Sequence, residues 1–153
     1  MKIAVQTEDF DVGLELNRLR ASRKDVGALV SFVGLVRDLN EGDAVAQLTL
    51  EHYPGMTEKA LRTIVNEAAS RWAIFDATVI HRVGTLQASE QIVLVAVSSA
   101  HRDQAFKASE FIMDYLKTQA PFWKKELTAS GERWLDEKAS DHDALNRWQA
   151  NDA

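Results

Sequence analysis

The chain is predicted to change from helix to extended strand within residues 111–126, whose sequence is FIMDYLKTQAPFWKKE. Apolar residues at helical spacing run up to Lys117, whereas Pro121 cannot lie inside a helix because it lacks an N–H group and clashes with the preceding turn. We therefore expect the helix to end between Lys117 and Ala120, and an extended, partly apolar segment to begin at Phe122. Lys117 then lies in the last helical turn, where exposed carbonyl groups favour a cation.

The same proline separates two lysines, Lys117 and Lys124, that stand seven positions apart. If the chain turns back after Pro121, their two amines meet at one anion-binding site. The alternative is a lysine at a helix C-terminus followed by surface lysines, since lysine side chains are mostly solvated. The sequence pattern leaves both interpretations open.

The composition is that of an ordinary globular protein of one domain. With 153 residues, of which 46% are hydrophobic and 27% charged, the chain can bury a core without disulfide or metal support. No apolar run reaches the roughly 18 residues of a membrane span, and the amino terminus lacks the apolar stretch of a secretory signal. We therefore expect a cytoplasmic protein that does not enter a membrane.

The chain contains no cysteine, which excludes disulfides, thiolate metal ligands and a cysteine nucleophile. Its four histidines are far apart and lack metal-ligand spacing, and no glycine-rich phosphate loop occurs. We therefore expect neither a metal nor a cofactor. If the protein handles sulfur, another molecule must bring it.

The distribution of charge is uneven. The formal net charge is −5, which argues against binding of nucleic acid through a broad basic face. Residues 101–125 nevertheless carry five basic side chains against three acidic ones. A small basic island in an acidic protein indicates a compact anionic ligand rather than a polymer.

The remaining elements predict a single α+β domain over residues 1–153, with helices packed on a mostly antiparallel sheet. Strands are expected at 2–6, 26–36, 44–53, 77–83 and 91–97, and a C-terminal hairpin at 122–127 and 133–137. Helices are expected at 12–20, at 57–72 with Thr57 as cap, and from a cap at Ser98 or Ser99 onward. Residues 139–153 are predicted to be a polar tail that is either mobile or docked through Leu145 and Trp148.

Two further positions are candidates for anion binding. His101 and Arg102 follow Ser98–Ser99 at an expected helix start, where free N–H groups and the helix dipole attract phosphate, and a guanidinium can bind two phosphate oxygens. Arg37 follows the longest apolar strand, in a loop that can reach a pocket mouth. The alternatives are solvated residues at the helix start and a surface ion pair of Arg37 with Asp38 or Asp43.

Four separated motifs occur in the chain: LTLEHYPGMTEKAL (Leu48–Leu61), VIHRVGTL (Val79–Leu86), SSAHR (Ser98–Arg102) and the stretch at 111–126 already quoted. Together they resemble one known family, the catalytic (large) subunit of molybdopterin synthase. The similarity runs from about Gly27 to Trp148 in the same order and spacing.

The resemblance implies an α/β hammerhead fold and a homodimer at the centre of a heterotetramer, with a small ubiquitin-like subunit docked at each end. The C-terminal Gly-Gly thiocarboxylate of that partner donates sulfur. Two deliveries convert cyclic pyranopterin monophosphate, a small pterin substrate, into molybdopterin, whose dithiolene later holds molybdenum. No cysteine of this chain is required.

The resemblance also implies roles for individual residues. Lys117 and Lys124 match the catalytic lysines of the family, and the substrate-binding positions correspond to Leu35, Val36, Arg37, His101, Arg102, Lys117, Lys124, Lys125 and Glu126. One departure stands next to them: relatives often carry a basic residue where this chain has Gln119.

Two other functions remain compatible with the residues alone. One is a non-catalytic module that binds a ubiquitin-like tail, with the basic island receiving a carboxylate. The other is a small-anion phosphatase that uses His101 and Arg102.

Overall fold

The computed structural model describes residues 1–40, 43–135 and 139–150. The helices are α1 (Val12–Arg20), α2 (Met56–Arg71), α3 (Arg102–Gln119) and α4 (Ala139–Ala150). The strands are β1 (Lys2–Gln6), β2 (Ala28–Leu35), β3 (Leu39–Asn40), β4 (Asp43–His52), β5 (Ile74–Arg82), β6 (Gly84–Gln87), β7 (Gln91–Ser99), β8 (Phe122–Thr128) and β9 (Gly131–Leu135). None of the described helices is long and apolar enough to cross a membrane.

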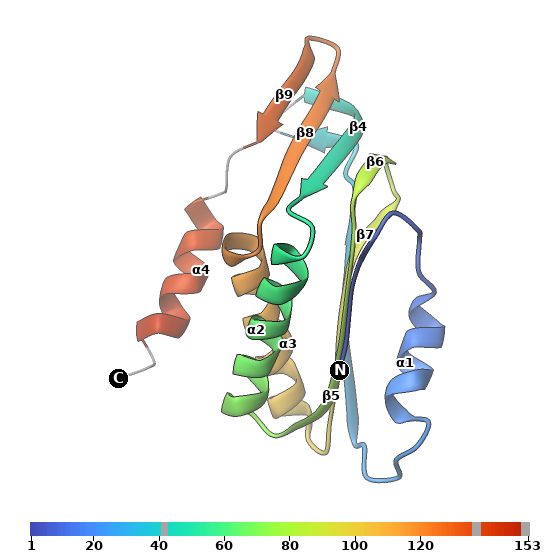
Figure 1. Ribbon diagram of the computed structural model, residues 1–153, viewed down its shortest axis with the longest axis vertical. Coiled ribbons are helices and arrows are strands. Elements are labelled where there is room, and N and C mark those ends of the chain that lie inside the picture. The colour runs from blue at the N-terminus through green and yellow to red at the C-terminus, as the bar shows by residue number, and fades with distance from the viewer. Residues whose placement is uncertain (41–42, 136–138, 151–153) are drawn as a thin grey trace.

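Two sheets form the framework. In the first, the strand order is β1-β5-β7-β2, and only the β1–β5 pair is parallel. In the second, the order is β3-β4-β8-β9, with β6 also paired to β4, and every pair is antiparallel. Figure 1 shows α2 and α3 on one face of the first sheet, α1 on the other, and the second sheet beyond one end of α2 and α3. The prediction of an α+β fold with a mostly antiparallel sheet is confirmed.

The core follows the alternation of side chains along the strands. On β7, Val93, Val95 and Val97 pack with buried residues of α2 and α3, while Leu94 and Ala96 pack with Leu19 of α1. Because both faces of this sheet are covered, its central strands are continuous apolar runs rather than alternating ones. The sheet is therefore a fixed base for the helix that carries Lys117.

The junction between α3 and β8 holds the two lysine-bearing elements together. Helix α3 ends at Gln119, and Ala120 is already extended, with φ −85° and ψ 133°. The carbonyl of Pro121 accepts a hydrogen bond of 3.3 Å from the Thr57 hydroxyl of α2. The Phe122 ring stacks on the His81 ring of β5 at 3.8 Å between centroids. The expected end of the helix is confirmed, and the turn is anchored on both sides.

Three local predictions were wrong. Thr57 is not the N-cap of α2 but lies buried in its first turn, and Gly55, with φ 85°, occupies the cap. Ser98 and Ser99 still belong to β7, where their hydroxyl groups donate to Asp76 and Ala73 carbonyls, so α3 begins later. Residues 84–87, expected in a loop, form strand β6 on β4.

Helix α4 lies where a polar tail was expected. Leu145 is buried, and the Trp148 ring lies edge-on to Trp72 and Phe111, at 5.3 and 5.6 Å between centroids. The Trp148 indole N–H donates to the Asp114 carboxylate of α3 at 2.6 Å. The described part of the tail is therefore docked through the two residues that the sequence singled out, while 136–138 and 151–153 lie outside the described residues.

We expect Trp148→Ala to lower the free energy of unfolding by about 3 kcal/mol, because the substitution removes two aromatic contacts and leaves a cavity. Chemical denaturation followed by circular dichroism measures the change. Trp134→Ala is the matched control, since Trp134 is 57% exposed on β9 and its loss should have little effect. Equal destabilisation by the two substitutions would show that α4 is not docked as described.

Candidate active site

Lys117 and Lys124 open onto one cavity of about 250 Å³, which we term the lysine cavity. Its lining residues come from both sheets, from α3 and from the loop after β2: Leu35, Val36, Arg37, Asn40, Val45, Leu48, Ile92, Lys117, Lys124, Glu126 and Leu135. Arg37, Lys117 and Lys124 bring three cationic groups to this space. The arrangement is suited to binding a small anion.

The two lysines line one cavity because of the direction that the chain takes after α3. Lys117 lies in the last turn of α3, and Lys124 is the third residue of β8. Strand β8 pairs with β4 through Leu50 opposite Lys124 and Leu48 opposite Glu126. Since alternate residues of a strand share a face, Lys124 and Glu126 both reach the cavity.

Lys125, which the resemblance places among the substrate-binding positions, does not line the lysine cavity. It lies on the other face of β8, where its amine is 3.5 Å from the Glu132 carboxylate and 5.2 Å from the centre of the Trp134 ring. The cause is the alternation of side chains along a strand, which separates consecutive residues.

Glu126 introduces a carboxylate into this basic cavity, and the carboxylate is paired. It is buried, accepts a hydrogen bond of 3.0 Å from the Asn40 side-chain amide, and forms a 3.1 Å ion pair with Arg133 of β9. Arg133 also donates to the Asn40 carbonyl at 3.1 Å. Glu126 therefore ties the loop after β2 to the β8–β9 hairpin.

Arg37 is exposed at the mouth of the cavity. Its guanidinium donates a hydrogen bond of 3.4 Å to the Asn40 side-chain oxygen. The side chain of Asp43 lies outside the described residues. An incoming anion would meet Arg37 before it reached the lysines.

His101 and Arg102 do not reach the lysine cavity of their own chain. His101 is the N-cap of α3 and Arg102 its first residue, whereas Lys117 lies in the last turn. A helix rises 1.5 Å per residue, so about 22 Å of helix separate Arg102 from Lys117. Both side chains are exposed.

Sequence reasoning missed His81 and Arg133. His81 is 3% exposed beneath the α3–β8 junction, and its Nδ1 lies 2.8 Å from the Arg82 carbonyl, so this nitrogen carries the proton. Burial, with smaller contributions from the charges of Lys117 and Lys124, lowers the pKa of His81 to about 3, and the ring is neutral.

The position of Arg133 could have been predicted from the sequence, because a hairpin that turns at Ser130–Gly131 places Arg133 opposite Glu126. Among the described residues, no group of side chains is suited to hold a metal ion.

The chain matches the family model described as MoaE protein over residues 5–119. It is 60% identical over 146 residues to the molybdopterin synthase catalytic subunit of Ralstonia nicotianae, covering 95% of this chain and 83% of that one. The solved "Molybdopterin biosynthesis MoaE protein" of Burkholderia ambifaria MC40-6 superposes with a TM-score of 0.83 at 54% identity, covering 97% of each chain.

A more distant structure shares the fold at 22% identity, with a TM-score of 0.70 and 90% of each chain covered. Its title is "Protein-protein complex of subunit 1 and 2 of Molybdopterin-converting factor from Helicobacter pylori 26695".

The neutral His81 predicts how stability depends on pH. Its folded-state pKa of about 3 lies below the ordinary value of 6.5, so between these limits the unfolded chain binds the extra proton. The free energy of unfolding should therefore fall as the pH is lowered from about 6.5, with His81 contributing up to about 1.4 kcal/mol per pH unit. Urea denaturation of the wild type and His81→Phe between those pH values measures the slope.

His81→Phe retains an aromatic ring against Phe122 and cannot titrate, so its slope should be shallower by about one proton. His142→Gln, at an exposed position of α4, is the control and should keep the wild-type slope. A slope that is unchanged in His81→Phe would contradict the buried neutral imidazole.

Proposed function

The chain belongs to the MoaE family, whose curated relatives are named molybdopterin synthase catalytic subunit, and we propose that its lysine cavity is where sulfur transfer takes place. The observation that carries this proposal is the convergence of Lys117, Lys124 and Arg37 on one small cavity. The chain has no cysteine, so the sulfur must arrive on another molecule. The substrate would be cyclic pyranopterin monophosphate and the product the dithiolene of molybdopterin.

The sulfur donor in this proposal is the C-terminal Gly-Gly thiocarboxylate of a small ubiquitin-like subunit. The Helicobacter pylori structure, titled as a complex of two subunits, supports a protein partner. An extended Gly-Gly tail is narrow enough to enter a small cavity, and its terminal negative charge matches the cations there. The attack of sulfur would join tail and substrate through a thioester as a substrate oxygen leaves the carbon. Water would then hydrolyse the acyl–sulfur bond, so that the sulfur stays on the substrate and the tail leaves as a carboxylate.

Each cavity residue would have a role that follows from its position. Arg37, at the mouth, binds the phosphate of the substrate. Lys117 transfers a proton as the thiocarboxylate sulfur attacks a carbon of the substrate side ring, and Lys124 stabilises the negative charge that develops or remains on the tail. Glu126 positions the loop after β2 through Asn40 and Arg133.

His101 and Arg102 would contact substrate from a second copy of the chain. They cannot serve the cavity of their own chain because nearly the whole of α3 lies between them and Lys117. In a homodimer, the exposed start of α3 in one protomer can face the cavity of the other, so that each pocket is shared. Phe32 and Phe106 are exposed apolar residues, 42% and 61% accessible, that are suited to such a contact.

Reconstitution separates this function from its alternatives. The chain is mixed with thiocarboxylated small subunit and cyclic pyranopterin monophosphate, and dithiolene product is assayed. Binding of the partner without product would favour a non-catalytic module. Turnover of simple phosphate esters without a partner would favour a phosphatase.

In the same assay, Lys117→Ala should lower the rate of dithiolene formation by about 100-fold or more, because proton transfer by a positioned group is lost. Lys107→Ala is the matched control, since Lys107 is exposed on the same helix and should not matter. Folding is checked by circular dichroism and partner binding by calorimetry. Near-full activity of a folded, partner-bound Lys117→Ala variant would refute the role of this lysine.

A shared pocket predicts complementation between inactive variants. A chain carrying His101→Ala and Arg102→Ala is unfolded and refolded together with Lys117→Ala chains, so that mixed dimers form. Each mixed dimer then has one pocket with all its residues intact, and random mixing should restore roughly a quarter of wild-type activity. If the mixture stays as inactive as its parents although mass spectrometry detects mixed dimers, the pocket is not shared.

A further inference from the structure

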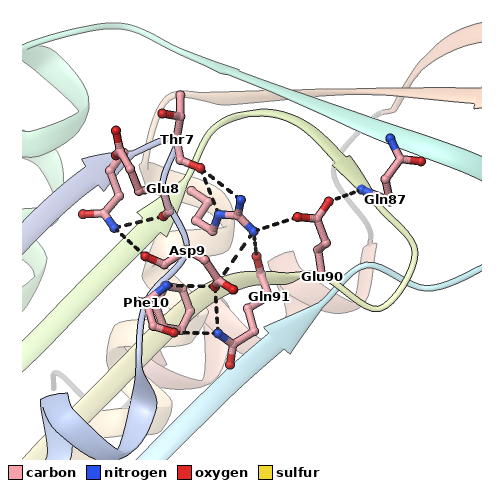
Figure 2. Close-up of polar contacts among 9 residues, drawn as sticks. Thr7, Glu8, Asp9, Phe10, Gln87, Glu90 and Gln91 are labelled. Atoms are coloured by element: carbon pink, nitrogen blue, oxygen red, sulfur yellow. Dashed lines mark hydrogen bonds and ion pairs between the residues drawn. The ribbon is translucent and has the colours of Figure 1, made fainter.

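Arg82 is a buried guanidinium at the end of β5 that the proposed chemistry does not use. Its side chain is 8% exposed, and it donates three hydrogen bonds of 3.0–3.1 Å to main-chain carbonyls: two to Thr7 and one to Gln91. The Glu90 carboxylate lies 3.4 Å away and the Asp9 carboxylate 4.0 Å away. Figure 2 shows Thr7 and Asp9 of the β1–α1 loop lying close to Glu90 and Gln91 at the start of β7.

The β6–β7 turn that Arg82 holds is bonded in turn to the lining of the lysine cavity. The Val36 N–H donates to the Glu90 carbonyl at 2.9 Å, and the Val36 carbonyl accepts from the Ser89 N–H at 2.8 Å. Both main-chain groups of Val36 are therefore fixed by this turn. Val36 is buried in the cavity wall, and the next residue along the chain is Arg37.

The turn needs an external support to keep this shape. Ser89 has φ 73°, a left-handed conformation that is unfavourable for residues other than glycine. The Glu90 carboxylate accepts a hydrogen bond from the Gln87 N–H at 2.5 Å and so closes the turn. The same Glu90 carboxylate faces Arg82, whose guanidinium neutralises the charge of the carboxylate. The guanidinium also donates to the carbonyl of the next residue, Gln91.

We propose that Arg82 is a positioning residue for substrate binding: through the turn at Ser89–Glu90 it fixes the Val36 main chain and thereby the place of Arg37 at the cavity mouth. Arginine is required because one planar guanidinium donates to two loops at once, whereas a lysine amine is a single point charge. Arg82 itself does not touch the substrate. This inference rests on the proposed function, since it assumes that Arg37 binds the substrate phosphate.

A double-mutant cycle tests the coupling between Arg82 and Arg37. In reconstituted enzyme, Arg82→Lys should raise the KM for cyclic pyranopterin monophosphate by about tenfold with little change in kcat, because phosphate binding is lost rather than proton transfer. In an Arg37→Ala background, the same substitution should change KM by less than about twofold. Arg62→Lys, at an exposed position of α2, is the control.

Amide hydrogen exchange followed by NMR tests the structural part separately. In Arg82→Lys, the Val36 and Ser89 amides should exchange faster, while amides in the middle of β7 keep their protection. If Arg82→Lys does not fold, Glu90→Ala replaces it, because its side chain is 39% exposed and its removal opens the same turn. Glu67→Ala, at a 52% exposed position of α2, is then the control.

The outcomes distinguish a failure of the positioning role of Arg82 from a failure of the proposed function. Faster exchange at Val36 together with a rise in KM that requires Arg37 supports the proposal. Unchanged exchange at Val36, or an equal rise in KM with and without Arg37, overturns it. If Arg37→Ala itself leaves KM unchanged, the role of Arg37 in the proposed function fails, and the positioning role of Arg82 fails with it even where Val36 exchanges faster.

Discussion

The site depends on one constraint, the enforced end of α3 before Pro121. Proline cannot continue the helix, so the chain must leave it within one turn of Lys117 and enter β8 a few residues before Lys124. The Thr57 hydroxyl on the Pro121 carbonyl and the Phe122 ring on His81 fix the direction of that exit. Without them, the two amines would lie on elements free to separate.

The electrostatics of the cavity follow from how its other titratable groups are held. Glu126 is paired with Arg133, and the cost of burying its carboxylate is offset by its hydrogen bonds. His81 stays neutral because burial opposes its charge, so it adds no further cation next to the lysines. A small basic cavity is thus present in a chain of net charge −5, which suits a small anionic ligand.

Sequence reasoning succeeded where local chemistry decides the structure. Pro121 marked the end of α3, and the C-terminal hairpin was expected from the apolar segments on either side of its turn. Sequence reasoning failed where pairing between segments that are far apart in the sequence determines the structure. Strand β6 forms because it pairs with β4, and Ser98 and Ser99 remain in β7, where their hydroxyl groups donate to the Asp76 and Ala73 carbonyls, so that the N-cap of α3 is His101. Lys125, which the resemblance implies as a substrate-binding position, lies on the face of β8 that is turned away from the lysine cavity.

The most direct test of the account is a crystal structure of the chain with cyclic pyranopterin monophosphate bound. The account predicts the ligand in the lysine cavity, with its phosphate on Arg37 and its ring system within hydrogen-bond reach of the Lys117 and Lys124 amines. A ligand bound elsewhere, or held in the cavity without contact to either lysine, would contradict this account, in which the turn at Pro121 places the Lys117 and Lys124 amines at one substrate-binding site.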